Sequence, residues 1–139
     1  MKINNLPIDG QQLRIAKIAK KFHVKLVILF GSFASGKNKA DSDLDIAVLG
    51  LNTISFSEQV KLANEFAQIF QKDVDLTAIN GANPLLSFQI SKNAVLLFGS
   101  QREFMKFKLY AFHVFNDYAP FFQLEKDLNK KIINAYANW

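Results

Sequence analysis

Two aspartates one residue apart, Asp43 and Asp45, follow a glycine-serine pair, Gly31 and Ser32, with ten residues in between. If residues 43–49 are extended, both carboxylates point to the same side, because the side chains of a strand alternate between its two faces. Neighbouring carboxylates repel each other, so a cation between them is favoured unless one is protonated. Oxygen ligands with no His or Cys nearby suit Mg²⁺ or Mn²⁺ rather than zinc. The alternative is a solvated strand edge whose aspartates only cap a turn.

A third carboxylate favours the metal site. Asp75 lies in the apolar segment 74–79, on the face opposite to its valine, leucine and alanine. If this segment pairs with the strand that carries Asp45, three carboxylates meet, and such a group can hold the two divalent ions used in phosphoryl transfer. Asp73 is on the same face, but it lies at the start of the segment and is the weaker candidate.

The glycine-serine pair fits phosphate binding. Gly31 directly follows an apolar segment, where a glycine lets the backbone turn sharply and lets a phosphate approach closely. Ser32 can donate its hydroxyl and its backbone N–H to that phosphate. A helical turn after the pair would add further N–H groups and a favourable dipole. Alone this pair is weak support, but its fixed spacing to the aspartates makes the combination specific.

Alternating helical and strand patterns predict the elements that position these residues. Short apolar runs predict four strands, at 25–30, 44–49, 74–79 and 94–98. Helical periodicity predicts helices at 10–22, from Ser55 to about Gln71, and from Pro84 to about Asn93. The pattern of the remaining 39 residues predicts two helices, with the break between them at Pro120. The fold class is therefore α/β (α+β), with a small mixed sheet of about four strands, flanking helices and additional C-terminal helices.

Composition limits the other function classes. The chain has 139 residues, a net charge of +5 and no cysteine, which excludes disulfides and thiolate metal sites and fits a reducing cytosol. Its first residues lack the apolar core of a signal peptide, and no segment approaches the roughly 20 apolar residues of a membrane span. There is no arginine-rich run or RNA-binding signature, so we expect no direct role in nucleic-acid binding.

The spacing of the motifs resembles a known signature. Gly-Ser, ten residues and Asp-x-Asp resemble the pattern of the DNA polymerase beta-like nucleotidyltransferase superfamily, and the chain is similar to its minimal nucleotidyltransferase (MNT, MntA-like) antitoxins. The resemblance includes the segments GSF, DVDL, AVLLFGS and REF. It implies one nucleotidyltransferase domain over residues 1–139, with 101–139 as a helical C-terminal extension. It also implies that Asp43, Asp45 and Asp75 are catalytic and bind metal, and that Gly31 and Ser32 bind the nucleotide.

The resemblance implies an activity and a partner as well. A member of this family would be a cytoplasmic antitoxin that transfers AMP from ATP, with Mg²⁺ or Mn²⁺, to a tyrosine of a HEPN-domain ribonuclease toxin. Two alternatives remain open. One is a non-catalytic antitoxin that neutralises its partner by contact alone. The other is a small-molecule nucleotidyltransferase, for which 139 residues leave little chain to build an acceptor pocket.

One residue departs from the family pattern. Ser35 stands where the family often has an arginine, whose planar guanidinium can bind two phosphate oxygens at once. Lys37 and Lys39 lie in the same loop and could replace it as nucleotide-binding point charges. The alternative is that both lysines belong to a solvated loop.

The C-terminal segment is rich in aromatic residues, with ten of the eighteen in the chain. Helical spacing predicts a stripe that packs on the domain: Phe104, Phe107, Ala111, Val114 and Tyr118. A second apolar group, Met105, Leu109 and Phe112, lies on a different side of the same helix. This group either binds a partner protein or is covered by the predicted last helix, at 121–136.

Overall fold

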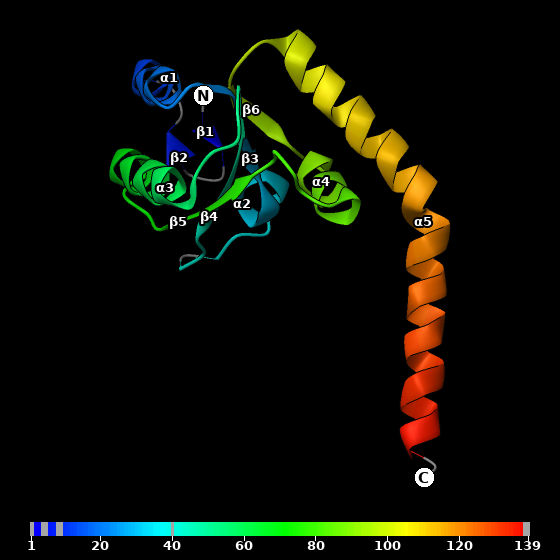
Figure 1. The fold of residues 1–139 in the computed structure, drawn as a ribbon. Helices are drawn as coiled ribbons and strands as arrows, with labels where there is room; N and C mark the ends of the chain where they lie inside the picture. The colour runs from blue at the N-terminus through cyan, green and yellow to red at the C-terminus, as the bar shows by residue number, and fades with distance from the viewer. Residues whose placement is uncertain (1, 4–5, 8–9, 40, 138–139) are drawn as a thin grey trace.

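The computed structural model describes residues 2–3, 6–7, 10–39 and 41–137 (Figure 1). The elements in chain order are β1 (Lys2–Ile3), β2 (Leu6–Pro7), α1 (Gln12–Lys21), β3 (Val24–Phe30), α2 (Gly31–Ser35), β4 (Leu44–Gly50), α3 (Phe56–Phe70), β5 (Val74–Ala78), α4 (Pro84–Ser91), β6 (Val95–Phe98) and α5 (Gln101–Ala137). No helix within these described ranges has the length and apolar character that a membrane crossing requires.

The central sheet has four strands in the order β5-β4-β3-β6. Strand β3 pairs antiparallel with β4 and β6, whereas β4 and β5 run parallel. The sheet is therefore mixed, as the sequence predicts, and β1 and β2 form a separate antiparallel pair. The parallel β4–β5 pair needs a crossover connection, and α3 supplies it.

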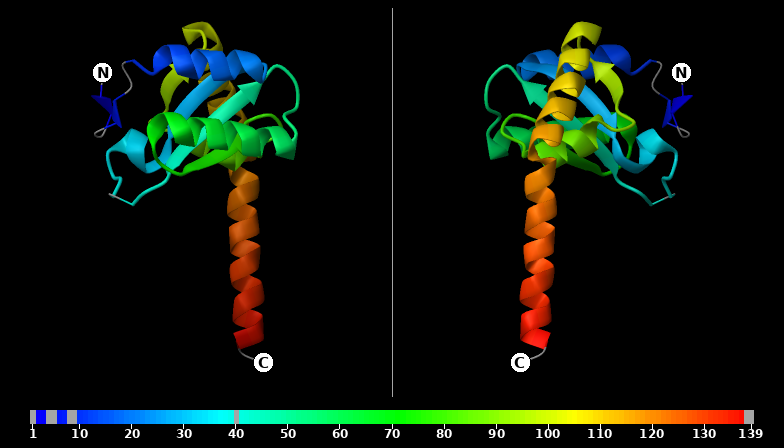
Figure 2. Two further views of the ribbon diagram at one scale, coloured as in Figure 1. Left: turned by 90° about the vertical axis from the view of Figure 1, so that its left-hand side faces the viewer. Right: turned by 90° about the vertical axis from the view of Figure 1, so that its right-hand side faces the viewer.

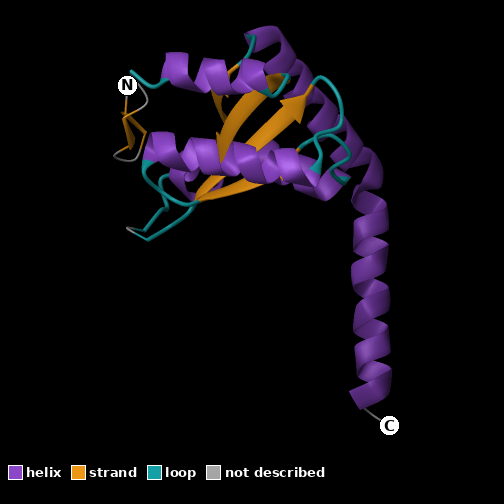
Figure 3. Ribbon diagram, turned by 60° about the vertical axis from the view of Figure 1, so that its left-hand side comes forward, coloured by secondary structure: helices purple, strands orange, loops and turns teal. Residues whose placement is uncertain are grey.

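Helices cover both faces of the sheet. One apolar cluster joins α1 and α3 to one face, with Ile15, Phe66 and Ile46 among its fully buried members. The other joins α4 and the start of α5 to the opposite face, through residues such as Ile90, Phe107 and Ile28. Figure 3 shows α1 and α3 crossing the near face of the strands, with α5 behind them. Helix, sheet and helix thus form three layers.

Local capping signals determine where two of the helices begin. The Ser55 hydroxyl accepts a hydrogen bond from the Glu58 N–H at 3.2 Å and donates one to the Glu58 carboxylate at 3.1 Å. The side chain of Asn83 accepts a hydrogen bond from the Leu86 N–H at 2.8 Å, directly before Pro84. These contacts confirm the starts of α3 and α4 that the capping spacing and the proline predicted.

The predicted break at Pro120 is wrong. Residues 101–137 form one helix of 37 residues with Pro120 inside it, and the helix changes direction near its middle (Figure 1). A proline removes one N–H donor and crowds the preceding turn, which bends a helix but need not end it. Here Pro120 is exposed, so water can satisfy the carbonyl that loses its partner.

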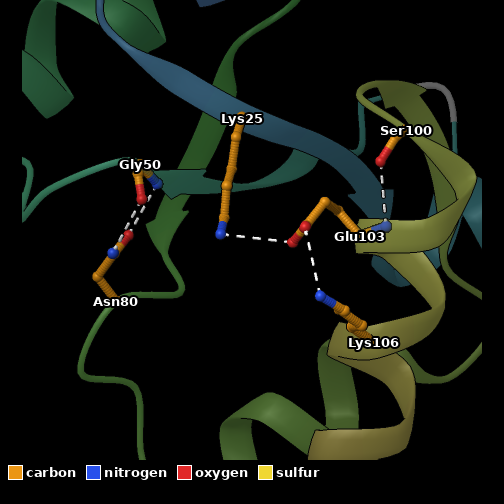
Figure 4. Close-up of polar contacts among 6 residues, drawn as sticks. All are labelled: Lys25, Gly50, Asn80, Ser100, Glu103 and Lys106. Atoms are coloured by element: carbon orange, nitrogen blue, oxygen red, sulfur yellow. Dashed lines mark hydrogen bonds and ion pairs between the residues drawn. The ribbon is translucent and has the colours of Figure 1, made fainter.

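The base of α5 is anchored to the sheet. Phe104, Phe107 and Ala111 are buried, which confirms the first part of the predicted stripe. The Glu103 carboxylate contacts the ammonium groups of Lys25 at 3.4 Å and Lys106 at 3.8 Å (Figure 4). The hydroxyl of Ser100 accepts a hydrogen bond from the Glu103 N–H at 3.1 Å, so it caps the first turn.

The sequence predicted that the buried stripe continues to Tyr118, and this part of the prediction is wrong. Val114 is half-buried and Tyr118 is 49% exposed, because α5 has begun to leave the domain at this point (Figure 2). The second apolar group is exposed as well: Met105 by 48%, Leu109 by 55% and Phe112 by 52%. The alternative in which a separate last helix covers this group is wrong, because residues 121–136 continue α5 and point away from it.

Candidate active site

The structure brings two of the three aspartates side by side at one end of the sheet. In the parallel β4–β5 pair, Asp45 lies directly opposite Asp75. In the antiparallel β3–β4 pair, Asp45 lies opposite Phe30, the last residue before Gly31. The end of β3 and the starts of β4 and β5 therefore meet at Asp45.

Strand alternation directs these carboxylates away from the first apolar cluster. Leu44 and Ile46 of β4 are fully buried in the cluster under α1 and α3, so Asp45 between them faces the other side of the sheet. The same holds for Asp75 between Val74 and Leu76, which pack against that cluster. Asp75 itself is exposed and Asp45 is partly buried.

Asp43 precedes β4 and is exposed. It is close enough to Asp45 for its charge to affect the pKa of that carboxyl group. Asp73 lies exposed just before β5, and its backbone carbonyl accepts a hydrogen bond from the Leu44 N–H at 2.9 Å. Asp45 therefore lies opposite Asp75 and within the influence of the Asp43 charge, whereas Asp73 contributes a backbone contact to the same strand pair.

Gly31 is required at its position for two reasons. Its φ is +72°, a conformation that side-chain-bearing residues rarely adopt. In addition, a Cβ at this position would overlap with the carboxylate of Asp45. The backbone N–H of the next residue, Ser32, donates a hydrogen bond to the same carboxylate. The missing side chain thus lets the Asp45 carboxylate lie against the first turn of α2.

The electrostatics of the site disfavour a charged Asp45. Burial raises the pKa of the Asp45 carboxyl group above its ordinary value, and the negative charges of Asp75 and Asp43 raise it further. The hydrogen bond from the Ser32 N–H opposes this shift in the pKa but does not cancel it. A cation near Asp45 would relieve the repulsion.

The carboxylate oxygens at the site suit a hard divalent cation, but the described residues supply only part of its ligands. Carboxylate oxygens are the ligands that Mg²⁺ and Mn²⁺ prefer. Among the described residues, however, no group of three or more His, Cys, Asp or Glu side chains is arranged to hold a metal ion by itself. Mg²⁺ is commonly held by one or two carboxylates together with substrate phosphates, so the site fits an ion that binds along with a nucleotide.

The loop between α2 and β4 carries the predicted lysines in exposed positions. Its backbone is held by hydrogen bonds from the Lys37 N–H to the Ser32 carbonyl at 2.9 Å and from the Lys39 N–H to the Ser42 hydroxyl at 2.8 Å. The hydroxyl of Ser35, at the position where the family often has arginine, donates a hydrogen bond to the Ser32 carbonyl at 3.3 Å. Ser35 therefore supports the turn, and the positive charges of the loop come from the two lysines.

Sequence reasoning missed one cation near α2. The ammonium group of Lys72 lies 5.3 Å from the centre of the Phe33 ring, so Lys72 at the start of the β5 segment contacts the helix that begins at Gly31. Lys72 lies three residues before Asp75, and that proximity in sequence was its only signal. Phe33 packs in the apolar cluster under α1 and α3, which is the cluster that Asp45 and Asp75 face away from.

One cavity lies away from the aspartates. A cavity of about 320 Å³ opens at the opposite end of β4 and β5, between Leu49, Ile79, Lys106 and Tyr110. None of the three aspartates lines it. We place the candidate site at the aspartates nevertheless, because phosphate chemistry needs charged ligands and backbone donors more than an enclosed apolar volume.

Comparison with known proteins adds independent information. Residues 14–103 match the family described as "Polymerase beta, Nucleotidyltransferase". The protein adenylyltransferase MntA of Shewanella oneidensis is 34% identical over 98 residues, which cover 67% of this chain and 70% of that protein.

Two solved structures share the fold. One is a toxin-antitoxin crystal structure with AMP-PNP, with a TM-score of 0.73 and 27% identity over 84% of this chain and 97% of the matched chain. The other is the toxin-antitoxin MntA-HepT, with a TM-score of 0.67 and 25% identity over 85% of this chain and 96% of the matched one.

The electrostatics at Asp45 generate a prediction for stability. Because its pKa is higher in the folded than in the unfolded protein, the folded state binds more protons between the two values, and stability falls as pH rises through that window. Asp45→Asn removes the charge, so we expect it to melt at a higher temperature than the wild type at neutral pH. The difference should vanish once the pH is below the window.

Thermal melts from acidic to neutral pH would measure this effect. Asp41→Asn is a suitable control, because Asp41 is an exposed carboxylate in the loop just before β4. We expect this control to follow the wild type at every pH. A lower melting temperature for Asp45→Asn at neutral pH would contradict the predicted repulsion.

Proposed function

The chain belongs to the polymerase beta nucleotidyltransferase family, and on that premise we propose that it is an antitoxin that transfers AMP from ATP to a tyrosine of a HEPN-domain toxin. The observation that carries the proposal is the strand register that sets Asp45 opposite Asp75 and against Gly31 and Ser32. The similarity to a protein adenylyltransferase supports the reaction, and the similarity to toxin-antitoxin complexes supports the partner.

The family match over residues 14–103 supports a proposal for the domain organisation. We treat residues 1–139 as one nucleotidyltransferase domain in which 101–139 form a helical extension. The family match ends at residue 103, and α5 begins at Gln101. The reaction consumes ATP and the chain contains no cysteine, so we place it in the cytoplasm.

The roles of the residues follow from their positions. Asp43 and Asp45 would hold Mg²⁺ or Mn²⁺ together with the triphosphate, and Asp75 would complete the acidic group beside the acceptor hydroxyl. The bound ion would neutralise charge on the phosphates. Gly31 and Ser32 bind the phosphates through backbone N–H groups and the serine hydroxyl. Lys37 and Lys39 in the neighbouring loop supply positive charge where the family often has an arginine.

The reaction is a substitution at the α-phosphorus of ATP. The hydroxyl oxygen of the acceptor tyrosine attacks this phosphorus, and the proton of that hydroxyl passes to the carboxylate of Asp75. The bond from the α-phosphorus to the oxygen that bridges to the β-phosphate breaks, and pyrophosphate leaves. The products are a tyrosine that carries AMP and free pyrophosphate.

Replacement of Asp43 or Asp45 distinguishes an antitoxin that transfers AMP from one that neutralises the toxin by contact alone. We expect Asp43→Asn and Asp45→Asn each to reduce AMP transfer by on the order of 10³-fold, because each removes a charge that acts on the transition state. Incubation with labelled ATP, Mg²⁺ and the toxin, followed by mass spectrometry of the toxin, would measure the transfer. Asp41→Asn is the matched control and should transfer AMP at the rate of the wild type. A toxin that stays unmodified by the wild-type chain but is still inhibited would favour neutralisation by contact.

The proposed metal site predicts that nucleotide binding depends on a divalent ion. Since substrate phosphates supply the oxygens that the protein lacks, ATP should bind more tightly with Mg²⁺ than in the presence of a chelator. Asp45→Asn should lose this difference, whereas Asp41→Asn should keep it. Calorimetric titration of the whole chain with ATP under both conditions is the measurement. Equal affinity with and without the ion would exclude a metal role for these carboxylates.

The exposed group of Met105, Leu109 and Phe112, here named the partner patch, is the proposed toxin-binding surface. Phe112→Ala should weaken toxin affinity by about 1–3 kcal/mol, the range for a buried aromatic anchor of an interface. It should change the stability of the isolated chain little, because Phe112 is 52% exposed there.

Phe107→Ala in the same helix is the matched control. Phe107 is only 6% exposed, so its loss should lower the free energy of unfolding by about 3–5 kcal/mol. Thermal melts and toxin titrations of both variants would distinguish the two roles. Unchanged toxin affinity for Phe112→Ala would rule out the partner patch as the interface.

A further inference from the structure

The proposed reaction does not use the cavity of about 320 Å³ at the far end of β4 and β5. Its walls come from the end of β4, the loop after β5, and helices α4 and α5, and they include Leu49, Ile79 and Phe107. Leu49 lies four residues after Asp45 in the same strand, which separates the cavity from the acidic group by about 13 Å. The volume is within the range of cavities that hold small molecules.

A polar group without a partner lies in the wall of this cavity. Ser87 of α4 is only 2% exposed, and its hydroxyl forms no hydrogen bond with any other residue that the structure describes. A buried hydroxyl without a partner costs free energy, so proteins nearly always satisfy such groups. The neighbouring side chains of Ile79, Ala82 and Phe107 are apolar and offer no partner. The partner of Ser87 therefore has to come from what occupies the cavity.

A surplus of positive charge borders the same cavity. The Glu103 carboxylate contacts two ammonium groups, that of Lys25 at 3.4 Å and that of Lys106 at 3.8 Å, so the three groups together carry one positive charge (Figure 4). Lys106 lines the cavity, and its contact with Glu103 is close to the limit of about 4 Å for an ion pair. The Lys106 side chain is also 60% exposed, so its ammonium group can turn toward an anion at the mouth of the cavity.

The loop that closes the cavity is fixed without a ligand. The Gly50 N–H donates a hydrogen bond to the side-chain oxygen of Asn80 at 2.8 Å, and the Asn80 amide donates one to the Gly50 carbonyl at 3.2 Å (Figure 4). The next residue, Gly81, turns the chain with a φ of +79°. This wall is therefore formed in advance, as is usual for small-molecule sites.

We propose that this cavity binds a small carboxylic acid with an apolar body and a hydroxyl group at the end opposite to its carboxylate. The carboxylate accepts a hydrogen bond from the Lys106 ammonium at the mouth. The apolar body lies against Leu49, Ile79 and Phe107. The hydroxyl group pairs with the buried hydroxyl of Ser87. The contact with Lys106 is the stronger of the two polar contacts, because both of its groups are charged.

Three related compounds test the two polar contacts. The compound 4-hydroxyphenylacetate carries both groups, phenylacetate lacks the hydroxyl group, and 4-hydroxyphenylacetamide lacks the charge. Titration of the full chain followed by protein NMR would measure each dissociation constant. We expect 4-hydroxyphenylacetate to bind saturably, phenylacetate to bind about fivefold more weakly and the amide about tenfold more weakly. If none of the three bound saturably, water alone would fill the cavity and the proposal would be overturned.

Two variants assign these differences to residues. Ser87→Ala should bind 4-hydroxyphenylacetate and phenylacetate equally, and Lys106→Gln should lose the preference for the acid over the amide. Lys108→Gln removes a charge on the other side of α5 and should keep both preferences. Alanine is a good helix former and Lys106 is exposed, so we expect all three variants to melt like the wild type. Preferences that persisted in Ser87→Ala and Lys106→Gln would place the compounds elsewhere and contradict the proposal.

ATP distinguishes this cavity from the nucleotide site. Saturating ATP with Mg²⁺ should leave the affinity for 4-hydroxyphenylacetate unchanged, because Asp45 is about 13 Å from Leu49. Competition between the two compounds would assign the cavity to the nucleotide and overturn the proposal. Independent binding would support it, whether or not the chain transfers AMP.

Discussion

The close approach of the Asp45 carboxylate to the backbone at Gly31 is the contact on which the rest of the site depends. It exists because residue 31 has no side chain and because the backbone there has a positive φ. The strand register sets Asp45 opposite Asp75, and burial, followed by the negative charges of Asp75 and Asp43, raises the pKa of Asp45. The folded protein therefore holds like charges together at one end of its sheet, an arrangement that destabilises it when no cation is present.

The apolar layers on both faces of the sheet hold these charges in position. Leu44 and Ile46 anchor β4 on one face while Ala47 packs on the other. A shift of β4 by one residue would turn Asp45 into the apolar cluster under α1 and α3, so the core fixes the register strictly. A rigid strand register at a site of like charges is what a metal-nucleotide complex needs, because the ligands are positioned before the substrate arrives.

Helix α5 has two parts with different surroundings. Its first turns close the second face of the sheet, where Phe104 and Phe107 are buried and Glu103 contacts Lys25. Beyond Phe122 it is exposed on all sides. An exposed proline at position 120 fits this transition, because the bend and the lost hydrogen bond fall where the helix is leaving the domain. The helix thus presents apolar side chains that the described part of the domain does not cover, in the partner patch and among residues 121–136.

The sequence by itself determined the local features. Apolar runs placed the four strands to within a residue or two, and capping spacing placed the starts of α3 and α4. The Gly-Ser and Asp-x-Asp motifs indicated the candidate site, because alternation along a strand depends only on neighbouring residues.

Tertiary structure decided what depends on residues far apart in the chain. The pairing of Asp45 with Asp75, the overlap that forbids a Cβ at Gly31 and the contact of Lys72 with Phe33 all join separate segments. The continuity of α5 through Pro120 and the exposure of Tyr118 were also beyond the sequence pattern. A helical stripe predicts an apolar face, but only the path of the helix relative to the sheet decides whether anything lies against that face.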